Sequence, residues 1–304
     1  MPDTALGDSQ SHQPAETIGA AVRRLARAFR QAGLETPELD ARLLVADAAG
    51  VPRAALLAAP EVRLEGGASR RIASHEVRRL RREPVSRIIG RREFHGLMLE
   101  LDAATLDPRP ETEAIVETAL QLGRQGGVSG AEALRVLDLG TGTGAILIAI
   151  LAELPAASGV GTDIAPAALE VARRNALRHG VGARADFCCA DWLNGVMGMF
   201  DLVVSNPPYV ASGQIAALEP EVTQYDPRLA LDGGTDGLAA YRAILSAVHR
   251  VLQPAGRLLL EVGPGDAQAV LDLCRAHGFA AEGEHPFRMD LAGSPRCVAV
   301  KARQ

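Results

Sequence analysis

Apolar residues in the early part of the chain recur at the spacing of amphipathic helices. A first apolar stripe consists of Ala21, Leu25, Ala28 and Phe29. A second stripe consists of Leu39, Leu43, Leu44 and Ala48. Thr36 and Pro37 have the residue types of a helix N-cap and first helical residue, and Gly50 ends the second stripe. The pattern predicts two helices that pack on each other.

Two more helices are expected before the pattern changes. One begins at Pro52, and a strongly basic one covers Ala68–Arg82. We therefore predict a small helical domain over residues 15–83. Residues 1–14 are rich in Ser, Gln, Asp and Pro, which predicts a disordered tail.

Residues 84–107 are predicted to join this domain to the rest of the chain as a β-hairpin. Its two strands are expected at Ser86–Ile89 and Leu97–Leu101, with the turn at Phe94-His95-Gly96.

The remainder, residues 108–304, alternates short apolar runs with helical stretches. Strands are predicted at Arg135–Leu139, Gly159–Asp163, Ala185–Cys189, Phe200–Val204, Arg257–Val262 and Cys297–Lys301. Helices are predicted at Glu113–Leu122, Gly144–Glu153, Pro166–Arg178, Gly237–Val251 and Ala267–His277, with the Gly-rich stretch Gly123–Gly130 after the first of them. Strands that alternate with helices indicate an α/β fold with a doubly wound, mostly parallel sheet.

Composition limits the compartment and the partners. The net charge of −5 argues against a broad nucleic-acid-binding surface. The four cysteines lack C-x-x-C spacing, so no metal site is expected. The longest apolar run, Ala145–Ala152, is far too short to span a bilayer, and the polar N-terminus does not resemble a signal peptide. We expect a cytoplasmic protein that does not interact with membranes.

The segment from residue 70 to residue 92 is rich in arginine. Its arginines are Arg70, Arg71, Arg78, Arg79, Arg81, Arg82, Arg87, Arg91 and Arg92. Two interpretations are open, a solvated helix face or a docking face for an acidic or RNA-associated partner. The sequence does not decide between them.

The most rigid stretch of the sequence is Asn206-Pro207-Pro208-Tyr209, directly after the apolar run at residues 201–204. The prolines lack N–H groups and fix φ, so the chain can continue neither as strand nor as helix. Asn206 is thereby held at the carboxyl end of a strand, where open α/β sheets bind their ligands. An Asn oxygen, a proline carbonyl and the Tyr209 ring together suit a planar –NH2 group. An ordinary Asn-Pro turn is the alternative.

A second ligand signal is the glycine loop that joins a predicted strand to a predicted helix. The loop residues are Asp138, Gly140, Thr141, Gly142, Thr143 and Gly144. Glycines permit the tight turn and let a ligand approach the backbone. Asp138 lies where a carboxylate would face a cationic ligand rather than a pyrophosphate.

Acidic and aromatic residues at the ends of the next two strands complete a nucleoside site. Asp163 suits the two hydroxyls of a ribose. Asp191 offers a carboxylate to an exocyclic amine, and Trp192 offers an aromatic face to adenine, although a core anchor is the alternative for this single Trp.

Taken together, these motifs resemble the class I S-adenosylmethionine-dependent methyltransferases that act on planar nitrogens. Within them, the stretches at residues 89–97 (IGRREFHGL) and 108–113 (PRPETE) resemble the N5-glutamine methyltransferases of peptide chain release factors. Other stretches that carry the resemblance are residues 37–41, 206–209, 219–222, 232–237 and 290–293. The resemblance covers nearly the whole chain. It implies a seven-stranded Rossmann-like sheet, S-adenosylmethionine as cofactor, and class 1 release factors as partners that dock on the helical domain.

The resemblance also implies roles for further residues. Phe94 and the segment Glu111–Glu113 would surround the methionine end of the cofactor. Arg109 and Pro208 would join Phe94 and Glu111 in binding the substrate.

The mechanistic hypothesis centres on Asn206. Its Oδ1 and the Pro207 carbonyl would each accept one N–H of the substrate glutamine, and Tyr209 would pack on the amide plane. Several alternatives remain open. They are an adenine-N6 nucleic-acid methyltransferase, a glutamine methyltransferase of a large-subunit ribosomal protein, a non-catalytic partner-binding module, and a nucleotide-dependent dehydrogenase. A nucleic-acid substrate is not expected, because of the net charge.

Overall fold

A computed structural model describes residues 16–124, 133–283, 285–290 and 293–302. The chain divides into two compact units between Ile89 and Gly90. The predicted tail, most of the Gly-rich stretch after Leu122, and part of the 290–293 motif lie outside the described residues.

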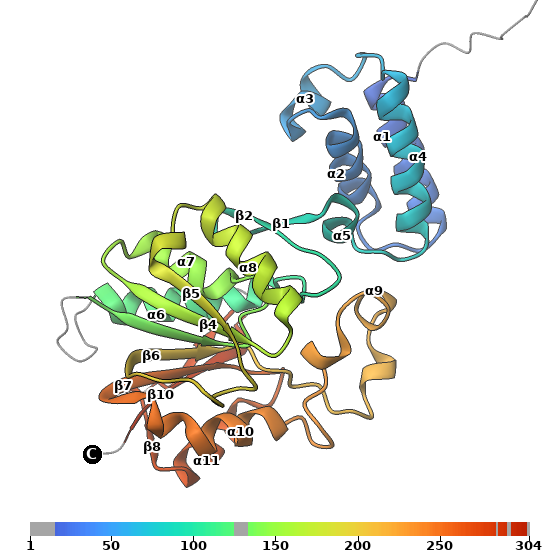
Figure 1. Ribbon diagram of the computed structural model, residues 1–304. Helices are drawn as coiled ribbons and strands as arrows, with labels where there is room; N and C mark the ends of the chain where they lie inside the picture. The colour runs from blue at the N-terminus through green and yellow to red at the C-terminus, as the bar shows by residue number, and fades with distance from the viewer. Residues whose placement is uncertain (1–15, 125–132, 284, 291–292, 303–304) are drawn as a thin grey trace, which may run out of the picture. The chain divides into compact units, whose positions relative to one another are not determined.

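The first unit is a bundle of helices. They are α1 (Ile18–Gln31), α2 (Pro37–Ala49), α3 (Arg53–Ala58), α4 (Gly66–Leu80) and α5 (Val85–Ile89) (Figure 1). The predicted N-cap of α2 is confirmed at Thr36, and Gly50 ends that helix in the left-handed conformation that glycine adopts without strain. Leu25, Phe29 and Leu44 are fully buried in its core, whereas Leu39 of the predicted stripe is 41% exposed.

Several arginines of the 70–92 segment hold this unit together, a role that neither interpretation of the sequence included. Arg79 is buried and its Nε donates to Asp40 Oδ2 at 2.7 Å. The Arg71 guanidinium donates to the Ala48 carbonyl at the end of α2. Arg78 donates to the Glu83 carboxylate and to backbone carbonyls of the same unit.

The prediction of a strand at Ser86–Ile89 is wrong. These residues form α5, in which the first turn bonds to the carbonyl of Pro84. The proline lacks an N–H but its carbonyl is free to start a helix, so the β-branched Ile88-Ile89 pair did not decide the local structure. The hairpin instead joins β1 (Arg91–Phe94) to β2 (Leu97–Glu100) around the predicted turn.

The described residues of the second unit contain a mixed, mainly parallel sheet of eight strands. The strands are β3 (Arg135–Leu139), β4 (Ser158–Asp163), β5 (Ala185–Cys189), β6 (Phe200–Ser205), β7 (Leu252–Glu261), β8 (Phe279–Ala281), β9 (Phe287–Met289) and β10 (Pro295–Ala302). Their order is β5-β4-β3-β6-β7-β10-β8, with β9 paired to β10. The doubly wound α/β prediction is confirmed. This order contains the seven expected strands, and β9 adds a short antiparallel partner to β10.

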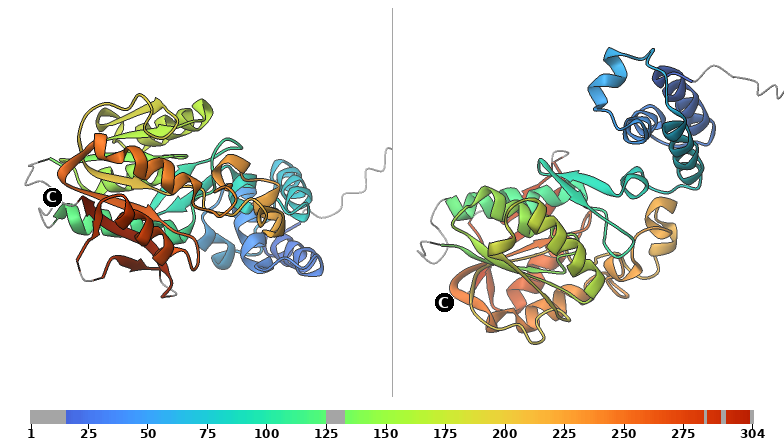
Figure 2. Two further views of the ribbon diagram at one scale, coloured as in Figure 1. Left: turned by 90° about the horizontal axis from the view of Figure 1, so that it is seen from below. Right: turned by 45° about the horizontal axis from the view of Figure 1, so that its top comes forward.

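Helices cover both faces of this sheet (Figures 1 and 2). They are α6 (Glu113–Arg124), α7 (Ala145–Glu153), α8 (Pro166–Arg178), α10 (Ala239–Ala247) and α11 (Ala267–Ala276), with the short α9 (Pro220–Thr223) in a connecting segment. None of the helices within the described residues has the length and apolar content needed to cross a bilayer.

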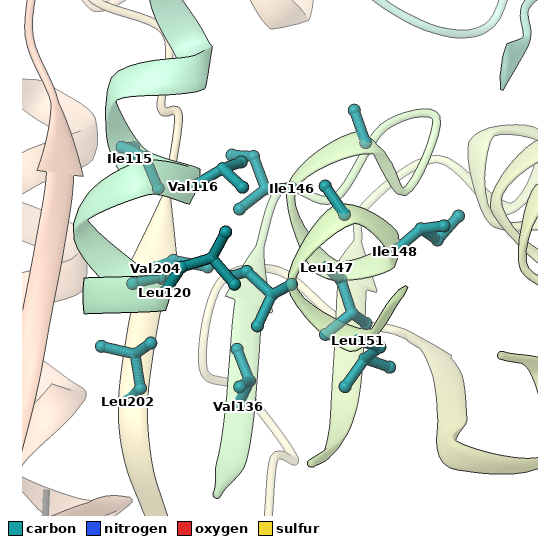
Figure 3. Packing of buried hydrophobic residues seen from close by; sticks show 14 of the residues in the cluster. Ile115, Val116, Leu120, Val136, Ile146, Leu147, Ile148, Leu151, Leu202 and Val204 are labelled. Carbon is teal, nitrogen blue, oxygen red and sulfur yellow. The ribbon is translucent and has the colours of Figure 1, made fainter. Parts of the chain in front are cut away.

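Alternate residues of each central strand point to opposite helical layers, as the two-residue strand period requires. Val136, Leu202 and Val204 face α6 and α7 (Figure 3). Their neighbours Leu137 and Val203 belong to the cluster that includes α10 and α11. The central strands are therefore buried on both faces, which explains their continuous apolar runs.

The buried Asp40–Arg79 pair is expected to stabilise the helical unit far more than a surface pair of the same charges. Asp40→Ala leaves the Arg79 guanidinium buried without this carboxylate, which we expect to cost about 3 kcal/mol. The control is Glu38→Ala. Glu38 lies in the same helix as Asp40, but its ion pair with Arg30 is exposed, so the loss should be less than about 1 kcal/mol. Denaturant unfolding of both variants checks this; equal losses would contradict it.

Candidate active site

A cavity of about 440 Å³ lies at the carboxyl edge of the parallel strands. Four adjacent strands, β5, β4, β3 and β6, each end in a segment that lines it. The predicted site residues among its lining are Gly140, Thr141, Gly142, Thr143, Asp163, Asp191, Trp192, Asn206 and Pro208. The structure thus brings together the glycine loop, the two aspartates, the tryptophan and the asparagine motif. Within the described residues, no cluster of three potential metal ligands was found.

The glycine loop is fixed by its neighbours rather than by its own sequence alone. Thr141 N donates to the Thr162 carbonyl of β4 at 2.8 Å. Gly144 has φ +81°, and a Cβ there would lie 2.7 Å from Ile148 Cδ1. A side chain at residue 144 would therefore be strained and would press on the first turn of α7.

Asp163 holds the loop and also lines the cavity. Its Oδ2 accepts the Gly142 N–H and its Oδ1 accepts the Ala165 N–H, both at 2.9 Å. A carboxylate oxygen can accept more than one hydrogen bond, so both oxygens can also receive donors from a ligand. Asp163 is therefore oriented before any ligand binds.

Asn206 is fixed at both its backbone and its side chain. The preceding Ser205 Oγ donates to the Leu139 carbonyl at 2.8 Å, which joins the end of β6 to the end of β3. Asn206 Nδ2 donates to Thr112 Oγ1 at 3.2 Å. Because Nδ2 is used in this way, Oδ1 is the acceptor that Asn206 can offer to a ligand.

Asp138 does not line the cavity, which corrects the expectation that it faces a cationic ligand. Its side chain is only 1% exposed, and Oδ2 accepts the Thr141 hydroxyl at 2.6 Å. Burial raises the pKa of Asp138 to about 7, and repulsion from Asp163 adds to this. Asp138 therefore stabilises the glycine loop through its hydrogen bond with Thr141.

Phe94 is placed in the core and not in the cavity wall. It is 1% exposed and belongs to the same apolar cluster as Leu99 and Ile115. It is not among the residues that line the cavity. Its expected place beside the methionine end of the cofactor stays a prediction.

The other predicted residues surround the cavity without belonging to its lining. Gly144 and the buried Pro207 are not among the lining residues, although their chain neighbours are. The Tyr209 ring lies on the backbone of Gly263, and burial raises the pKa of Tyr209 to about 12. Arg109 donates to Asp226 Oδ2 at 2.6 Å, and Glu111 lies 4.0 Å from Arg296.

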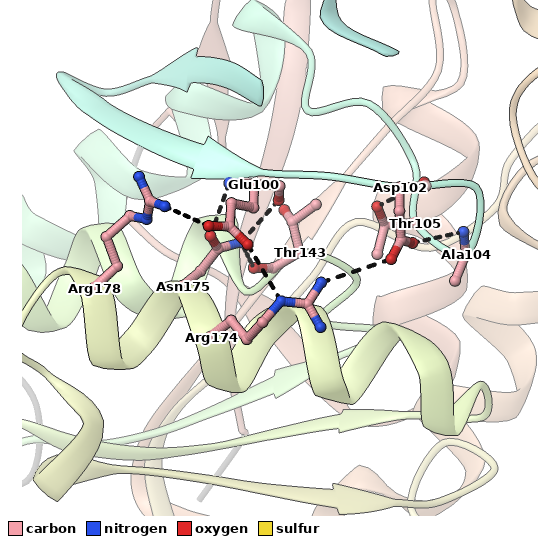
Figure 4. Close-up of polar contacts among 8 residues, drawn as sticks. All are labelled: Glu100, Asp102, Ala104, Thr105, Thr143, Arg174, Asn175 and Arg178. Carbon is pink, nitrogen blue, oxygen red and sulfur yellow. Dashed lines mark hydrogen bonds and ion pairs between the residues drawn. The ribbon is translucent and has the colours of Figure 1, made fainter. Parts of the chain in front are cut away.

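A buried asparagine that the sequence analysis missed ties the hairpin to the glycine loop (Figure 4). Asn175 in α8 is fully buried. Its Oδ1 accepts the Glu100 N–H at 2.8 Å, and its Nδ2 donates to the carbonyls of Glu100 and Thr143, each at 2.9 Å. The sequence did contain a clue to this role, because Asn175 is a polar residue on the apolar face of α8, beside Val171 and Ala172.

Charged residues of α8 strengthen the same connection. Arg174 and Arg178 both contact the Glu100 carboxylate, and Arg174 Nη2 lies 3.6 Å from Asp102 Oδ2. The segment after Asp102 continues into the cavity wall at residues 104–106. One wall of the cavity is thus anchored to the helix that follows β4.

The sequence comparisons agree with this architecture. Residues 20–90 match a family model described as the PrmC N-terminal domain, and residues 131–272 match a methyltransferase domain. A release factor glutamine methyltransferase of Bradyrhizobium diazoefficiens is 45% identical over 94% of this chain and 95% of its own length. The chain belongs to the release factor glutamine methyltransferase family.

Other relatives are consistent with this membership. A release factor glutamine methyltransferase of Rhodospirillum rubrum is 44% identical over 98% of this chain and 89% of its own length. A solved methyltransferase structure from Pyrococcus furiosus superposes with a TM-score of 0.50 and 18% identity, covering 68% of this chain and 90% of that one. That likeness shows a shared Rossmann-like methyltransferase fold. The matching family model and the curated relatives show that the protein is a methyltransferase.

The raised pKa of Asp138 predicts a pH-dependent difference in stability. Because the folded pKa is about 7 and the usual value is 3.8, the native state holds a proton that the unfolded state releases, so stability falls as pH rises from about 4 to 7. Asp138→Asn removes this loss. We expect the variant to gain on the order of 2 kcal/mol relative to the parent between pH 5 and pH 8, measured by denaturant unfolding. A difference that is the same at both pH values would contradict the assignment.

Proposed function

We propose that this protein transfers a methyl group from S-adenosylmethionine to the side-chain amide nitrogen, N5, of the glutamine in the Gly-Gly-Gln motif of class 1 peptide chain release factors. The observation that carries the proposal is the orientation of Asn206. Its Nδ2 is bound to Thr112, which leaves Oδ1 as an acceptor at the wall of the cavity. The names of the family members support the release-factor substrate.

The residues of the cavity fit S-adenosylmethionine. The volume of about 440 Å³ lies within the range of small-molecule sites, about 300–1,000 Å³. Asp163 would bind the ribose hydroxyls, Trp192 would contact adenine, and Asp191 would accept from its amine. Gly140 and Gly142 leave the backbone open to the ligand. When bound, this cofactor supplies an electrophilic methyl group.

The chain's own task is to hold and orient a poor nucleophile. An amide nitrogen is weakly nucleophilic because its lone pair is delocalised into the carbonyl. The Asn206 Oδ1 and the Pro207 carbonyl would each accept one N–H of the glutamine. Two fixed acceptors would orient the nitrogen and favour the positive charge that develops on it, and such groups are each worth about 10²–10³ in rate.

No strong general base is needed for this reaction. An amide that has gained a methyl group on nitrogen is cationic and readily loses an N–H proton to water. The proton on the product nitrogen would leave along the hydrogen bond to Asn206 or to Pro207. Catalysis would therefore depend on orientation and fixed dipoles.

The function is tested with methyl-labelled S-adenosylmethionine and several acceptors in parallel. The acceptors are an unmodified class 1 release factor, the same factor with Gln→Ala in its Gly-Gly-Gln motif, a large-subunit ribosomal protein, and single-stranded and duplex nucleic acid. Label on the first acceptor alone, mapped by mass spectrometry to the motif glutamine, is the expected result. Label on nucleic acid or on the ribosomal protein alone would overturn the proposal.

Asn206→Ala removes the proposed acceptor and should lower kcat by about 10²–10³. The affinity for S-adenosylmethionine should stay within about threefold, since the glycine loop and Asp163 are unchanged. Asn194→Ala, which truncates an exposed asparagine outside the cavity lining, is the matched control and should retain parental turnover. Near-normal kcat in Asn206→Ala would rule out the orienting role.

Asp163→Ala should instead weaken the binding of the cofactor. The loss of two hydrogen bonds to the ribose should weaken S-adenosylmethionine binding by about 10–100-fold in calorimetry. Asp186→Ala removes an exposed carboxylate from the neighbouring strand and should leave binding unchanged. A Kd within twofold of the parent for Asp163→Ala would contradict the ribose assignment.

A further inference from the structure

Asp232 lies beside the backbone that follows the Asn206–Tyr209 motif. Val210 and Asp232 form a parallel β-bridge. Its hydrogen bonds run from Val210 N to the Leu231 carbonyl at 3.0 Å and from Gly233 N to the Val210 carbonyl at 2.8 Å. A residue that is distant in the sequence is thereby fixed next to the motif that would hold the substrate glutamine.

Gly233 makes the closest approach to this motif. A Cβ at Gly233 would lie 2.8 Å from the Pro208 carbonyl oxygen and 2.9 Å from Tyr209 Cα, so a side chain there would force the two backbones apart. Pro208 directly follows Pro207, whose carbonyl is a proposed acceptor for the glutamine amide. The chain neighbour of Asp232 therefore packs on the proposed substrate subsite.

The Asp232 carboxylate lines the cavity, and donors on one of its oxygens orient it. Oδ1 accepts the Ser212 hydroxyl at 2.6 Å and the Gly234 N–H at 3.0 Å. The bond from Ser212, followed by that from Gly234, holds the pKa of Asp232 below its usual range, so the group is charged at neutral pH. Oδ2 lies 3.5 Å from Arg228 Nη2, whose side chain is 71% exposed. Such a long, exposed pair is weak, and a carboxylate oxygen has lone pairs for further donors.

We propose that Asp232 is a further substrate-binding residue, which accepts main-chain N–H groups of the peptide next to the target glutamine. The inference deepens the proposed function and rests on it for the identity of the peptide. In a Gly-Gly-Gln motif the two residues before the glutamine have no side chains, so the donors that they offer are main-chain N–H groups. Glycine also lets the peptide backbone approach a carboxylate closely, and the charge of the acceptor strengthens such hydrogen bonds.

Asp232 and Asn206 would then have separate tasks. Asn206 would orient the amide that reacts, whereas Asp232 would hold the main chain from which that amide projects. A main-chain contact is made by the bound substrate and by the transition state alike, so its loss should raise the KM for the release factor with little change in kcat. Binding of S-adenosylmethionine should not change, because Asp163 and the glycine loop are untouched.

Asp232→Asn tests the proposal at nearly constant shape. The amide oxygen can still accept the Gly234 N–H, so the loop is kept, but the charge is lost and one acceptor oxygen becomes an –NH2 group. The KM for an unmodified class 1 release factor should rise about 10–100-fold, because a hydrogen bond to a charged group is lost. Both kcat and the Kd for S-adenosylmethionine should stay within about threefold, and the unchanged Kd would show that the variant is folded.

Asp236→Asn is the matched control. Asp236 lies in the same loop and its Oδ1 accepts the Leu238 N–H at 3.1 Å, but it is exposed and is not among the lining residues. Its KM for the release factor should stay within about twofold of the parental value. Ser212→Ala keeps the Asp232 carboxylate but removes a donor that orients it, so it should raise this KM by a smaller factor, about threefold to tenfold.

Two results would overturn the role of Asp232 while the proposed function stands. One is an unchanged KM in Asp232→Asn, or equal increases in both aspartate variants. The other is a weakened affinity of Asp232→Asn for S-adenosylmethionine, because the carboxylate would then serve the cofactor. A parental enzyme that labels no release factor would instead reject the proposed function, and this inference with it.

Discussion

The site depends on the hydrogen bond from Ser205 Oγ to the Leu139 carbonyl. Leu139 is the last residue of β3 before the glycine loop, and Ser205 is the last residue of β6 before Asn206. Both residues are fully buried, so water does not compete for this bond at 2.8 Å. It sets the distance between the loop that would hold a cofactor and the asparagine that would hold a substrate.

Around that bond, buried side chains hydrogen-bond to the glycine loop, the hairpin and Asn206 and so fix their positions. Asn175 satisfies carbonyls of the hairpin and of the glycine loop, Asp138 accepts from Thr141, and Thr112 accepts from Asn206. The carboxylates in this layer raise the energy of the folded state, since burial opposes their ionisation. Their presence is consistent with a structure in which orientation of the site matters more than maximal stability.

The sequence predicted the parts of this structure that local pattern controls. Strands β3 and β5 and helix α8 begin and end at the predicted residues, because their apolar periods are strong and turn residues flank them. The lining residues Asp163, Asn206 and Trp192 were also predictable, because the carboxyl ends of parallel strands meet at one edge.

Long-range contacts decided the rest. Thr112 and Asn206 are 94 residues apart in the chain, and no period in the sequence connects them. The 86–89 segment became a helix because of bonds to Pro84 and not because of its own β-branched residues. The burial of Phe94 was likewise not predictable from its motif, because it depends on packing against Leu99 and Ile115.

The ion pair between Arg109 and Asp226 gives the cavity a physical property of its own. It clasps two wall segments that are 117 residues apart, and the Asp226 carboxylate is only 1% exposed, while Arg109 remains 37% exposed. Pro108 and Pro227, the chain neighbours of these two residues, both line the cavity, so the pair connects two parts of its wall. Dissolved ions screen the attraction of a pair whose cation is partly exposed. Ionic strength should therefore influence how firmly the two wall segments are held together.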